Sequence, residues 1–331
     1  MTALSQRADE EALRRCLEGS AAERGSGPAI VAIDSRRSDH SSSYASDVVT
    51  VRLAGGEELR LFLKDFGSSA LPKDDPGRQR ERELRVYREL LAGAGLGTAG
   101  YRGSVWDEAS GRFWLVLEFV GGTPLAYCGF DDWLEAARWL GRLHGHFAGR
   151  AERLRGCDFL LRHDAAFFWA KVRAARAAVS EVAPSLSGRL DDVLRDYGRC
   201  VEVMAGQPPT LVHGAYKPRH VLVDRDARPP GICPVDWELA AVGSAFYDLA
   251  FLAYGLGPPA LDRLLDAYRE EAGRHGLAPP DRGRVRHLVD CFRLHRALKA
   301  LGGASSRGLP EGKVARLVES AERLRSSIGE R

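Results

Sequence analysis

The sequence predicts an α+β protein with a β-rich N-terminal lobe and a mainly helical C-terminal lobe. Two observations support this fold class. Between residues 29 and 66, short segments alternate apolar and polar side chains and are rich in β-branched residues, as strands are. From Asp131 onward, apolar residues recur mostly at the three- and four-residue spacing of amphipathic helices. The 331 residues are enough for two lobes that each bury a hydrophobic core.

The chain is expected to divide into an N-terminal helical region (1–28), an N-lobe (29–120) and a C-lobe (121–331). A Gly55-Gly56 turn predicts that the second and third strands form a hairpin. The predicted strands are 29–37, 47–53 and 59–66, with two more before the break at Gly121-Gly122. The predicted helices are 2–24, one that begins after Pro76, 132–149, 160–179, 186–204, 260–276, 282–303 and 311–328.

Composition excludes several classes of protein. The net charge of +3, with no basic run interleaved with aromatic residues, does not favour a nucleic-acid partner. No window of about 18 apolar residues is present, so we expect no membrane span. The charged N-terminus does not resemble a secretory signal, and the six cysteines are scattered without a CxxC pair. Reduced thiols and a cytoplasmic location are therefore expected.

A serine-rich segment, SDHSSSYASD, separates the first two predicted strands. It includes Ser41, Ser42 and Ser43. One interpretation is a flexible surface connection. The other is a loop that covers phosphate groups with backbone N–H groups and hydroxyls. The pattern alone leaves both open.

Lys64 is the first candidate for chemistry. Only six of the 48 basic residues are lysines, so a lysine carries more information here than an arginine. Lys64 lies near the end of a predicted strand, and the helix that follows Pro76 turns Glu83 toward its apolar face because Glu83 precedes Tyr87 by four positions. An acid turned inward needs a cation, which predicts a Lys64–Glu83 ion pair; the alternative is two solvated surface residues.

The central stretch from Thr210 to Ala250 contains the strongest functional pattern. A polar loop, His213–His220, lies between two short apolar runs, and a third run ends at Asp236. A loop of donors and acceptors between short buried strands is where a rigid scaffold presents chemistry.

This stretch resembles the catalytic and metal-binding segments of aminoglycoside phosphotransferases and of the wider protein-kinase-like fold. In that family the loop reads His-Gly-Asp, four residues, Asn. Here His213 and Gly214 match, Lys217 falls where many such loops keep a lysine, and Asp236 matches the metal-binding aspartate. Asp248 is expected to support the fold by hydrogen bonding.

The resemblance implies a bilobal kinase-like protein that binds ATP and Mg²⁺ and transfers the γ-phosphate to a hydroxyl. It implies that Lys64 and Glu83 serve the nucleotide phosphates, and that backbone groups from Glu118 to Val120 meet the adenine. The implied metal ligands are Asp236 and His220; the implied catalytic positions are His213, Ala215 and Lys217; the implied acceptor contacts are Trp237, Glu238 and Arg293.

Two positions depart from the family pattern. Ala215 stands where the catalytic aspartate is expected, and His220 stands where the metal-binding asparagine is expected. A methyl group cannot accept a proton, and imidazole is a poor ligand for Mg²⁺. Three explanations stay open: an engineered inactivation, a nucleotide-binding pseudokinase, or an active enzyme in which His220, Glu238 or the substrate supplies the missing function.

The acceptor is expected to be a small-molecule alcohol or a peptide Ser/Thr. No strongly acidic cluster lines the C-terminal helices in the sequence, so a polycationic aminoglycoside is not favoured. The rival from another class is a non-catalytic subunit that positions a substrate or activates a protein partner.

Overall fold

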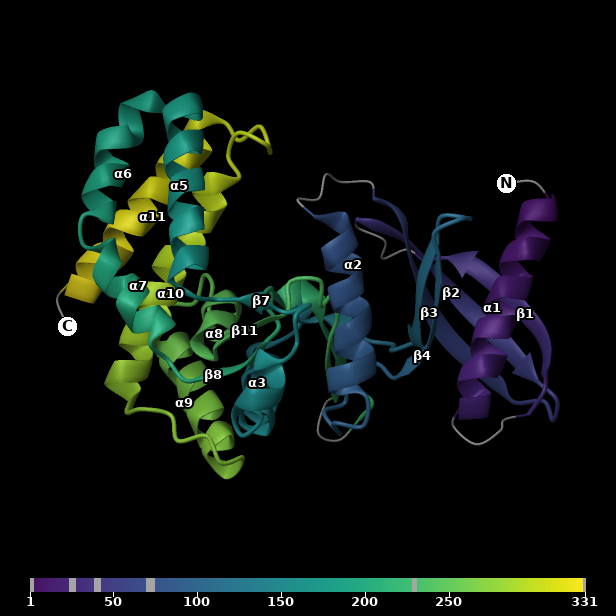
Figure 1. Cartoon of the computed structure of the whole chain (residues 1–331). Helices are drawn as coiled ribbons and strands as arrows, with labels where there is room; N and C mark the ends of the chain where they lie inside the picture. The colour runs from purple at the N-terminus through teal and green to yellow at the C-terminus, as the bar shows by residue number, and fades with distance from the viewer. Residues whose placement is uncertain (1–2, 24–27, 39–42, 70–74, 228–230, 330–331) are drawn as a thin grey trace. The chain divides into compact units, whose positions relative to one another are not determined.

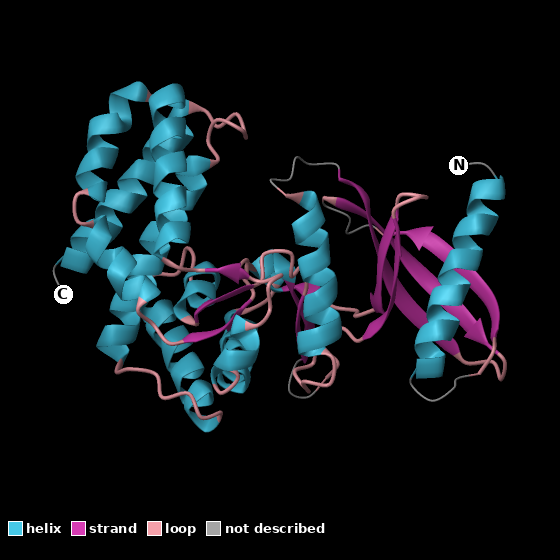
Figure 2. Cartoon of the chain, in the orientation of Figure 1, coloured by secondary structure: helices cyan, strands magenta, loops and turns pink. Residues whose placement is uncertain are grey.

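The computed structural model describes residues 3–23, 28–38, 43–69, 75–227 and 231–329. The chain forms two compact units: residues 1–122 with 224–226, and residues 123–223 with 227–331. The first unit contains a five-stranded antiparallel sheet, and the second is mostly helical (Figures 1 and 2). The predicted α+β class is therefore confirmed.

The sheet of the first unit has the strand order β1-β2-β3-β5-β4, with every neighbouring pair antiparallel. The strands are β1 (Ile30–Arg37), β2 (Tyr44–Leu53), β3 (Glu58–Ser69), β4 (Tyr101–Asp107) and β5 (Arg112–Glu118). The predicted hairpin of β2 and β3 is present, and both Gly55 and Gly56 adopt the positive φ that its turn requires. Strand β2 begins earlier than predicted, because part of the serine-rich segment pairs with β3.

Helices cover both faces of this sheet (Figure 1). The N-terminal helix α1 (Ala3–Glu23) places Leu13 and Leu17 against Leu61 and Leu63 of β3 in one buried cluster. The helix α2 (Pro76–Arg85), which continues as a π-helical segment (Val86–Leu91), lies on the opposite face. Because side chains alternate along a strand, the leucines of β3 face α1 while Lys64 faces α2.

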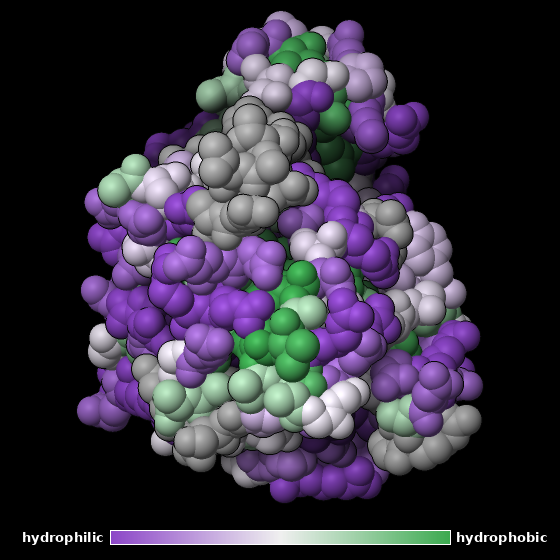
Figure 3. Space-filling view, turned by 90° about the vertical axis from the view of Figure 1, so that its right-hand side faces the viewer, coloured by the Kyte–Doolittle hydropathy of each residue, from purple (hydrophilic) through white to green (hydrophobic). Residues whose placement is uncertain are grey.

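An apolar hollow of about 380 Å³ remains between α1 and the sheet. Its lining includes Leu17, Ala21, Ile30 and Leu59. Figure 3 views the molecule from the side of this unit and shows a small apolar patch among mostly hydrophilic side chains. The contact between α1 and the sheet is thus incompletely filled.

The second unit is built on helices around two small sheets. Its helices are α3 (Phe130–Ala148), α4 (Ala151–Arg155), α5 (Ala165–Val182), α6 (Ser187–Leu194), α7 (Tyr197–Ala205), α8 (Phe246–Leu252), α9 (Pro258–Arg274), α10 (Arg282–Gly302) and α11 (Glu311–Gly329). Among the described residues, no helix has an apolar stretch long enough to cross a bilayer.

Two predicted helices were wrong in extent. The helix predicted for 160–179 begins only at Ala165, because Leu161 and Arg162 pair with another strand instead. The helix predicted for 186–204 is two helices, α6 and α7, separated at Arg195–Asp196. Apolar periodicity continued through both places, so it did not reveal either boundary.

The small sheets have the orders β10-β9-β6 and β7-β11-β8. Their strands are β6 (Thr123–Pro124), β7 (Leu161–Arg162), β8 (Pro209–Val212), β9 (Val221–Asp224), β10 (Gly231–Pro234) and β11 (Ala241–Ser244). Strands β8, β9 and β10 correspond to the three apolar runs of the central stretch. Strands β6, β7 and β11 were not predicted, because segments of two to four residues owe their conformation to pairing.

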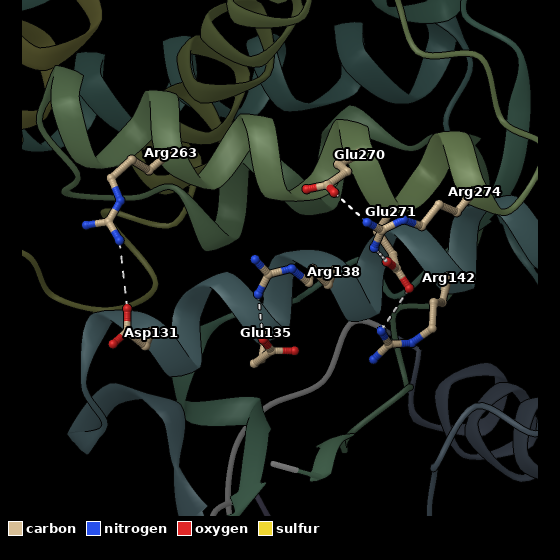
Figure 4. Close-up of polar contacts among 8 residues, drawn as sticks. All are labelled: Asp131, Glu135, Arg138, Arg142, Arg263, Glu270, Glu271 and Arg274. Carbon is tan, nitrogen blue, oxygen red and sulfur yellow. Dashed lines mark hydrogen bonds and ion pairs between the residues drawn. The ribbon is translucent and has the colours of Figure 1, made fainter. Parts of the chain in front are cut away.

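Helices α3 and α9 lie side by side and are joined by ion pairs (Figure 4). Arg142 of α3 contacts the largely buried Glu271 of α9 at 3.1 Å. A Cβ at Gly141 would lie 2.8 Å from the backbone nitrogen of Ala272, so the helices approach as closely as they do because this position has no side chain.

We predict that Gly141→Ala destabilises the protein by about 1–3 kcal/mol, because its methyl group must push the α9 backbone away. Gly149→Ala is the matched control, since a Cβ there meets nothing within 4 Å. Urea unfolding of both variants measures the difference. Equal stability of the two variants would contradict the close helix contact.

Candidate functional site

Lys64 of β3 and Glu83 of α2 form the predicted ion pair. Lys64 Nζ lies 2.7 Å from Glu83 Oε2, and the two side chains are only 12% and 2% exposed. The ammonium also lies 5.5 Å from the ring centre of Tyr44 and 5.4 Å from that of Phe66. A buried pair of this kind holds the lysine in one position, because removing the acid would leave a cation without compensation.

The structure describes some of the other predicted nucleotide contacts of the first unit but not all of them. Ser41 and Ser42 lie outside the described residues, whereas Ser43 is buried and its carbonyl accepts a hydrogen bond from Ser69 Oγ at 3.1 Å. The N–H groups of Glu118 and Phe119 donate to carbonyls within the sheet. Among described residues, none accepts from the N–H of Val120, which leaves that group available to a ligand.

A buried carboxylate from α8 fixes the start of the polar loop in the second unit. Asp248 has no exposed surface, and its two oxygens accept hydrogen bonds from the backbone N–H groups of His213 (2.6 Å) and Gly214 (3.0 Å). His144 Nε2 lies 3.6 Å from the same carboxylate. The expectation that Asp248 supports the fold by hydrogen bonding is confirmed.

Two further contacts hold the middle of the loop. Gly214 has φ of 77°, and a Cβ there would lie 1.9 Å from the carbonyl oxygen of Leu239, so only glycine fits. The hydroxyl of buried Tyr216 donates to the carbonyl of Ala136 at 3.0 Å, and its ring stacks on Trp139. The loop backbone is therefore held independently of the side chain at position 215.

Both ring nitrogens of His213 are engaged with backbone groups. Its Nε2 lies 3.0 Å from the carbonyl of Val235, so this nitrogen donates, and its Nδ1 accepts from the N–H of Ala215 at 3.3 Å. Burial lowers its pKa to about 4, which keeps the ring neutral. These contacts fix the orientation of the His213 ring, and its catalytic part stays a prediction.

Asp236 and His220 lie together at the end of the loop. Asp236 has φ of 70°, and its Oδ2 is 3.8 Å from His220 Nδ1; both side chains are about one-quarter exposed. A non-glycine residue in this conformation is strained, and such residues cluster at functional sites. Position 236 is the one non-glycine residue with positive φ in the described part of the chain.

Asp236 and His220 offer Mg²⁺ two different kinds of donor atom. Within the described ranges, no group of three His, Cys, Asp or Glu side chains converges as a metal cage. Mg²⁺ bound with a nucleotide needs only one or two protein carboxylates, and the rest of its shell is phosphate and water. Asp236 fits that requirement, whereas the imidazole of His220 does not.

The predicted acceptor contacts differ in exposure. Trp237 has no exposed surface; it packs against His213, with ring centres 4.5 Å apart, and donates to the carbonyl of Pro234. This burial does not fit the predicted acceptor contact at Trp237. Glu238 is partly exposed, and Arg293 is partly exposed and pairs with Asp290 at 3.3 Å.

Exposed Lys217 has cationic neighbours that the sequence reasoning missed. Although Lys217 is exposed overall, partial desolvation of its ammonium group lowers its pKa most. The charges of Lys299, Arg296 and Arg307, more than 75 positions away in the chain, lower this pKa further. The rarity of lysine was the available signal: Lys171, Lys217 and Lys299 are three of only six.

We predict that stability falls as the pH drops from 6.5 toward 4. Burial lowers the pKa of His213 to about 4 and that of His295 to about 3, whereas both titrate near 6.5 in the unfolded chain. The unfolded state therefore binds protons first, and each such histidine removes about 1.4 kcal/mol of stability per pH unit. Urea unfolding at pH 7.5, 6.5, 5.5 and 5.0 measures this slope.

The variant His295→Asn shows how much of this pH dependence comes from His295. It removes one of the titrating groups while keeping an acceptor for the hydroxyl of Tyr197. Its slope should be smaller by one group's contribution. A stability that does not change between pH 7.5 and 5.0 would show that these rings are not buried and neutral.

Several solved structures share the fold of this chain. The GDP complex of an aminoglycoside 2'-phosphotransferase-IIIa is 16% identical, with a TM-score of 0.62 over 93% of this chain and 97% of that one. The macrolide 2'-phosphotransferase MphH from Brachybacterium faecium is 20% identical, with a TM-score of 0.56 over 95% and 98%. A microcompartment-associated aminopropanol kinase is 17% identical, with a TM-score of 0.56 over 90% and 94%. These likenesses confirm the predicted kinase-like fold.

Among curated proteins, the sequence comparison finds no match. The model of the phosphotransferase enzyme family (APH) matches residues 38–288, which is more than half of the chain. The loop beginning at His213 and the Lys64–Glu83 pair both lie inside that match. The chain belongs to the phosphotransferase enzyme family.

Proposed function

We propose that this protein binds ATP with Mg²⁺ and transfers the γ-phosphate to a hydroxyl of a small molecule or of a peptide Ser/Thr. The observation that carries the proposal is the buried Lys64–Glu83 pair at 2.7 Å. In kinase-like folds, a strand lysine held by a helix glutamate binds the nucleotide phosphates. Residues 29–120 would bind the nucleotide, and residues 121–331 would carry the loop, the metal ligand and the acceptor.

Each residue has a definite part in this proposal. Lys64 would hold the α- and β-phosphates, the segment around Ser43 would cover them, and the N–H of Val120 would bind the adenine. Asp236 would hold Mg²⁺, which when bound neutralises phosphate charge. Lys217 would stabilise the charge on the γ-phosphoryl group during transfer.

Ala215 limits the rate but does not remove these parts. Phosphoryl transfer depends mainly on positioning and on electrostatic stabilisation, because the transition state is loose. A missing general base costs about 10² to 10⁴ in rate. His220, Glu238 or the acceptor itself would orient the hydroxyl. The structural neighbours are named for aminoglycoside, macrolide and aminopropanol acceptors, so the fold does not select one.

A second candidate function is a pseudokinase that binds nucleotide and positions a substrate or partner. The observation in its favour is Ala215, which is only 3% exposed within a fully formed loop. The loop is built, yet the side chain that would perform proton transfer is a methyl group. The two functions share nucleotide binding and differ in turnover.

We predict that ATP with Mg²⁺ raises the melting temperature of the protein, and that Lys64→Met abolishes this increase because the phosphates lose their cation. Lys313→Met is the matched control, since Lys313 is exposed on α11. Thermal shift with ATP, GTP and ADP measures the effect. No shift with any nucleotide would reject both candidate functions.

We predict that Ala215→Asp raises phosphoryl transfer about 10²- to 10⁴-fold, because the aspartate restores a base on an unchanged loop. ATP consumption and product formation are measured with acceptor panels. The same increase should be absent in the double variant Ala215→Asp, Asp236→Asn. Nucleotide binding without turnover in any form would favour the pseudokinase.

A further inference from the structure

Basic side chains from four segments of the second unit, one of them the polar loop, affect the ionisation of one another or of a shared histidine. Helix α5 contributes one, the loop contributes one, α10 contributes two, and the turn after α10 contributes one. We name them the cationic cluster: Lys171, Lys217, Arg296, Lys299 and Arg307. Three of the five are lysines, in a chain that has only six.

The two cations of α10 lie against neighbouring aromatic rings, one of which they share. Lys299 Nζ donates to the hydroxyl of Tyr247 at 3.2 Å and lies 5.4 Å from the ring centre of Phe251. The guanidinium of Arg296 lies 5.3 Å from the same ring and 3.5 Å from that of Tyr254. Tyr254 is 57% exposed, so this surface is open to solvent and to ligands.

The members of the cluster are close enough to affect one another's ionisation. Burial and then the charge of Arg296 lower the pKa of Lys299 to about 8. Burial and then the charges of Lys299, Arg296 and Arg307 lower the pKa of Lys217. Lys171 and Lys299 both lower the pKa of His295, after its burial. With a pKa of about 8, Lys299 is still mostly protonated at neutral pH and adds its positive charge to the cluster.

Four of the five cluster residues have no acidic partner among the described residues. In the part of the chain that the structure describes, Lys217, Arg296, Lys299 and Arg307 take part in no ion pair. The arginines between α3 and α9, in contrast, each face a carboxylate (Figure 4). Asp236 and Asp248 are the carboxylates whose charge favours protonation within the cluster, and Asp248 is already bound to the loop backbone.

Like charges that lie close together without counterions, as these four do, raise the free energy of the site, and an anion that binds among them removes that cost. We propose that the cationic cluster binds a phosphate or carboxylate group on the acceptor, so that the acceptor is a hydroxylated anion. This inference rests on the proposed function, because it takes the polar loop to be the place of transfer. A polycationic aminoglycoside would be repelled by the same charges.

Isothermal titration calorimetry with paired probes tests the inference at low ionic strength. Ribose 5-phosphate and glycerate are the anionic probes, ribose and glycerol are their neutral partners, and kanamycin is the cationic probe. The whole chain is used without nucleotide, so that the result does not depend on nucleotide binding. Arg296→Gln and Arg307→Gln remove cluster charges, and Arg284→Gln is the control from an exposed position on the same helix.

The expected result is binding of at least one anionic probe but neither neutral partner, weakened about 10-fold or more in each cluster variant and unchanged in Arg284→Gln. Thermal unfolding of each variant shows whether it is folded. Absence of binding by both anions at ligand concentrations of about 10 mM, or binding of kanamycin alone, would overturn the inference.

A separate titration with ADP and Mg²⁺ distinguishes the sources of the anion. If the cluster variants weaken ADP binding as strongly as Lys64→Met does, the cluster serves the nucleotide and the acceptor inference is overturned. If ADP fails to bind even the unmodified chain while ribose 5-phosphate binds through the cluster, the proposed function fails and the anion site stands.

Discussion

The buried carboxylate of Asp248 is the constraint on which the site of the second unit depends. Enclosing an ionised carboxylate costs several kcal/mol unless strong hydrogen bonds replace water. Here the backbone N–H groups of His213 and Gly214 supply those bonds, at 2.6 and 3.0 Å. The carboxylate and the loop therefore stabilise each other. Their pairing fixes where the chain passes before it reaches Ala215 and Lys217.

The sequence predicted most of the first unit because its structure follows local patterns. Alternation along 59–66 placed the leucines of β3 on one face and Lys64 on the other, and helical phase turned Glu83 inward. The 2.7 Å pair follows from those two periodicities. The second unit was predicted less completely. Strands of two to four residues, such as Leu161–Arg162, carry no periodicity of their own, and their conformation comes from distant partners.

The residues of the candidate site also fall into two groups, those that the sequence could identify and those that it could not. Motif positions such as Asp236 could be found from order along the chain, because their neighbours in sequence identify them. Lys299 and Arg307 could not, because no motif position identifies them and they lie more than 75 positions beyond the loop in the chain. The burial of Trp237 was equally hidden, because a tryptophan beside a motif suggests a contact surface until its environment is known.

The loop geometry and the loop chemistry are specified by different residues. Asp248, Gly214 and Tyr216 hold the backbone, and none of their contacts uses the side chain at position 215. An alanine there therefore changes the charge of the site without dismantling it. An aspartate at this position would bring a negative charge next to Lys217 and offset part of the cationic cluster.

With Ala215, that charge is missing from the protein and the cluster keeps its excess. An anionic acceptor would supply the same charge when it binds, and it would do so beside the hydroxyl that is to be phosphorylated. The absent carboxylate and the excess of cations then have the same consequence, which is that the site lacks negative charge. Under the proposed function, the substrate would complete the charge balance of the site, and the alanine would favour an anionic acceptor over a neutral one.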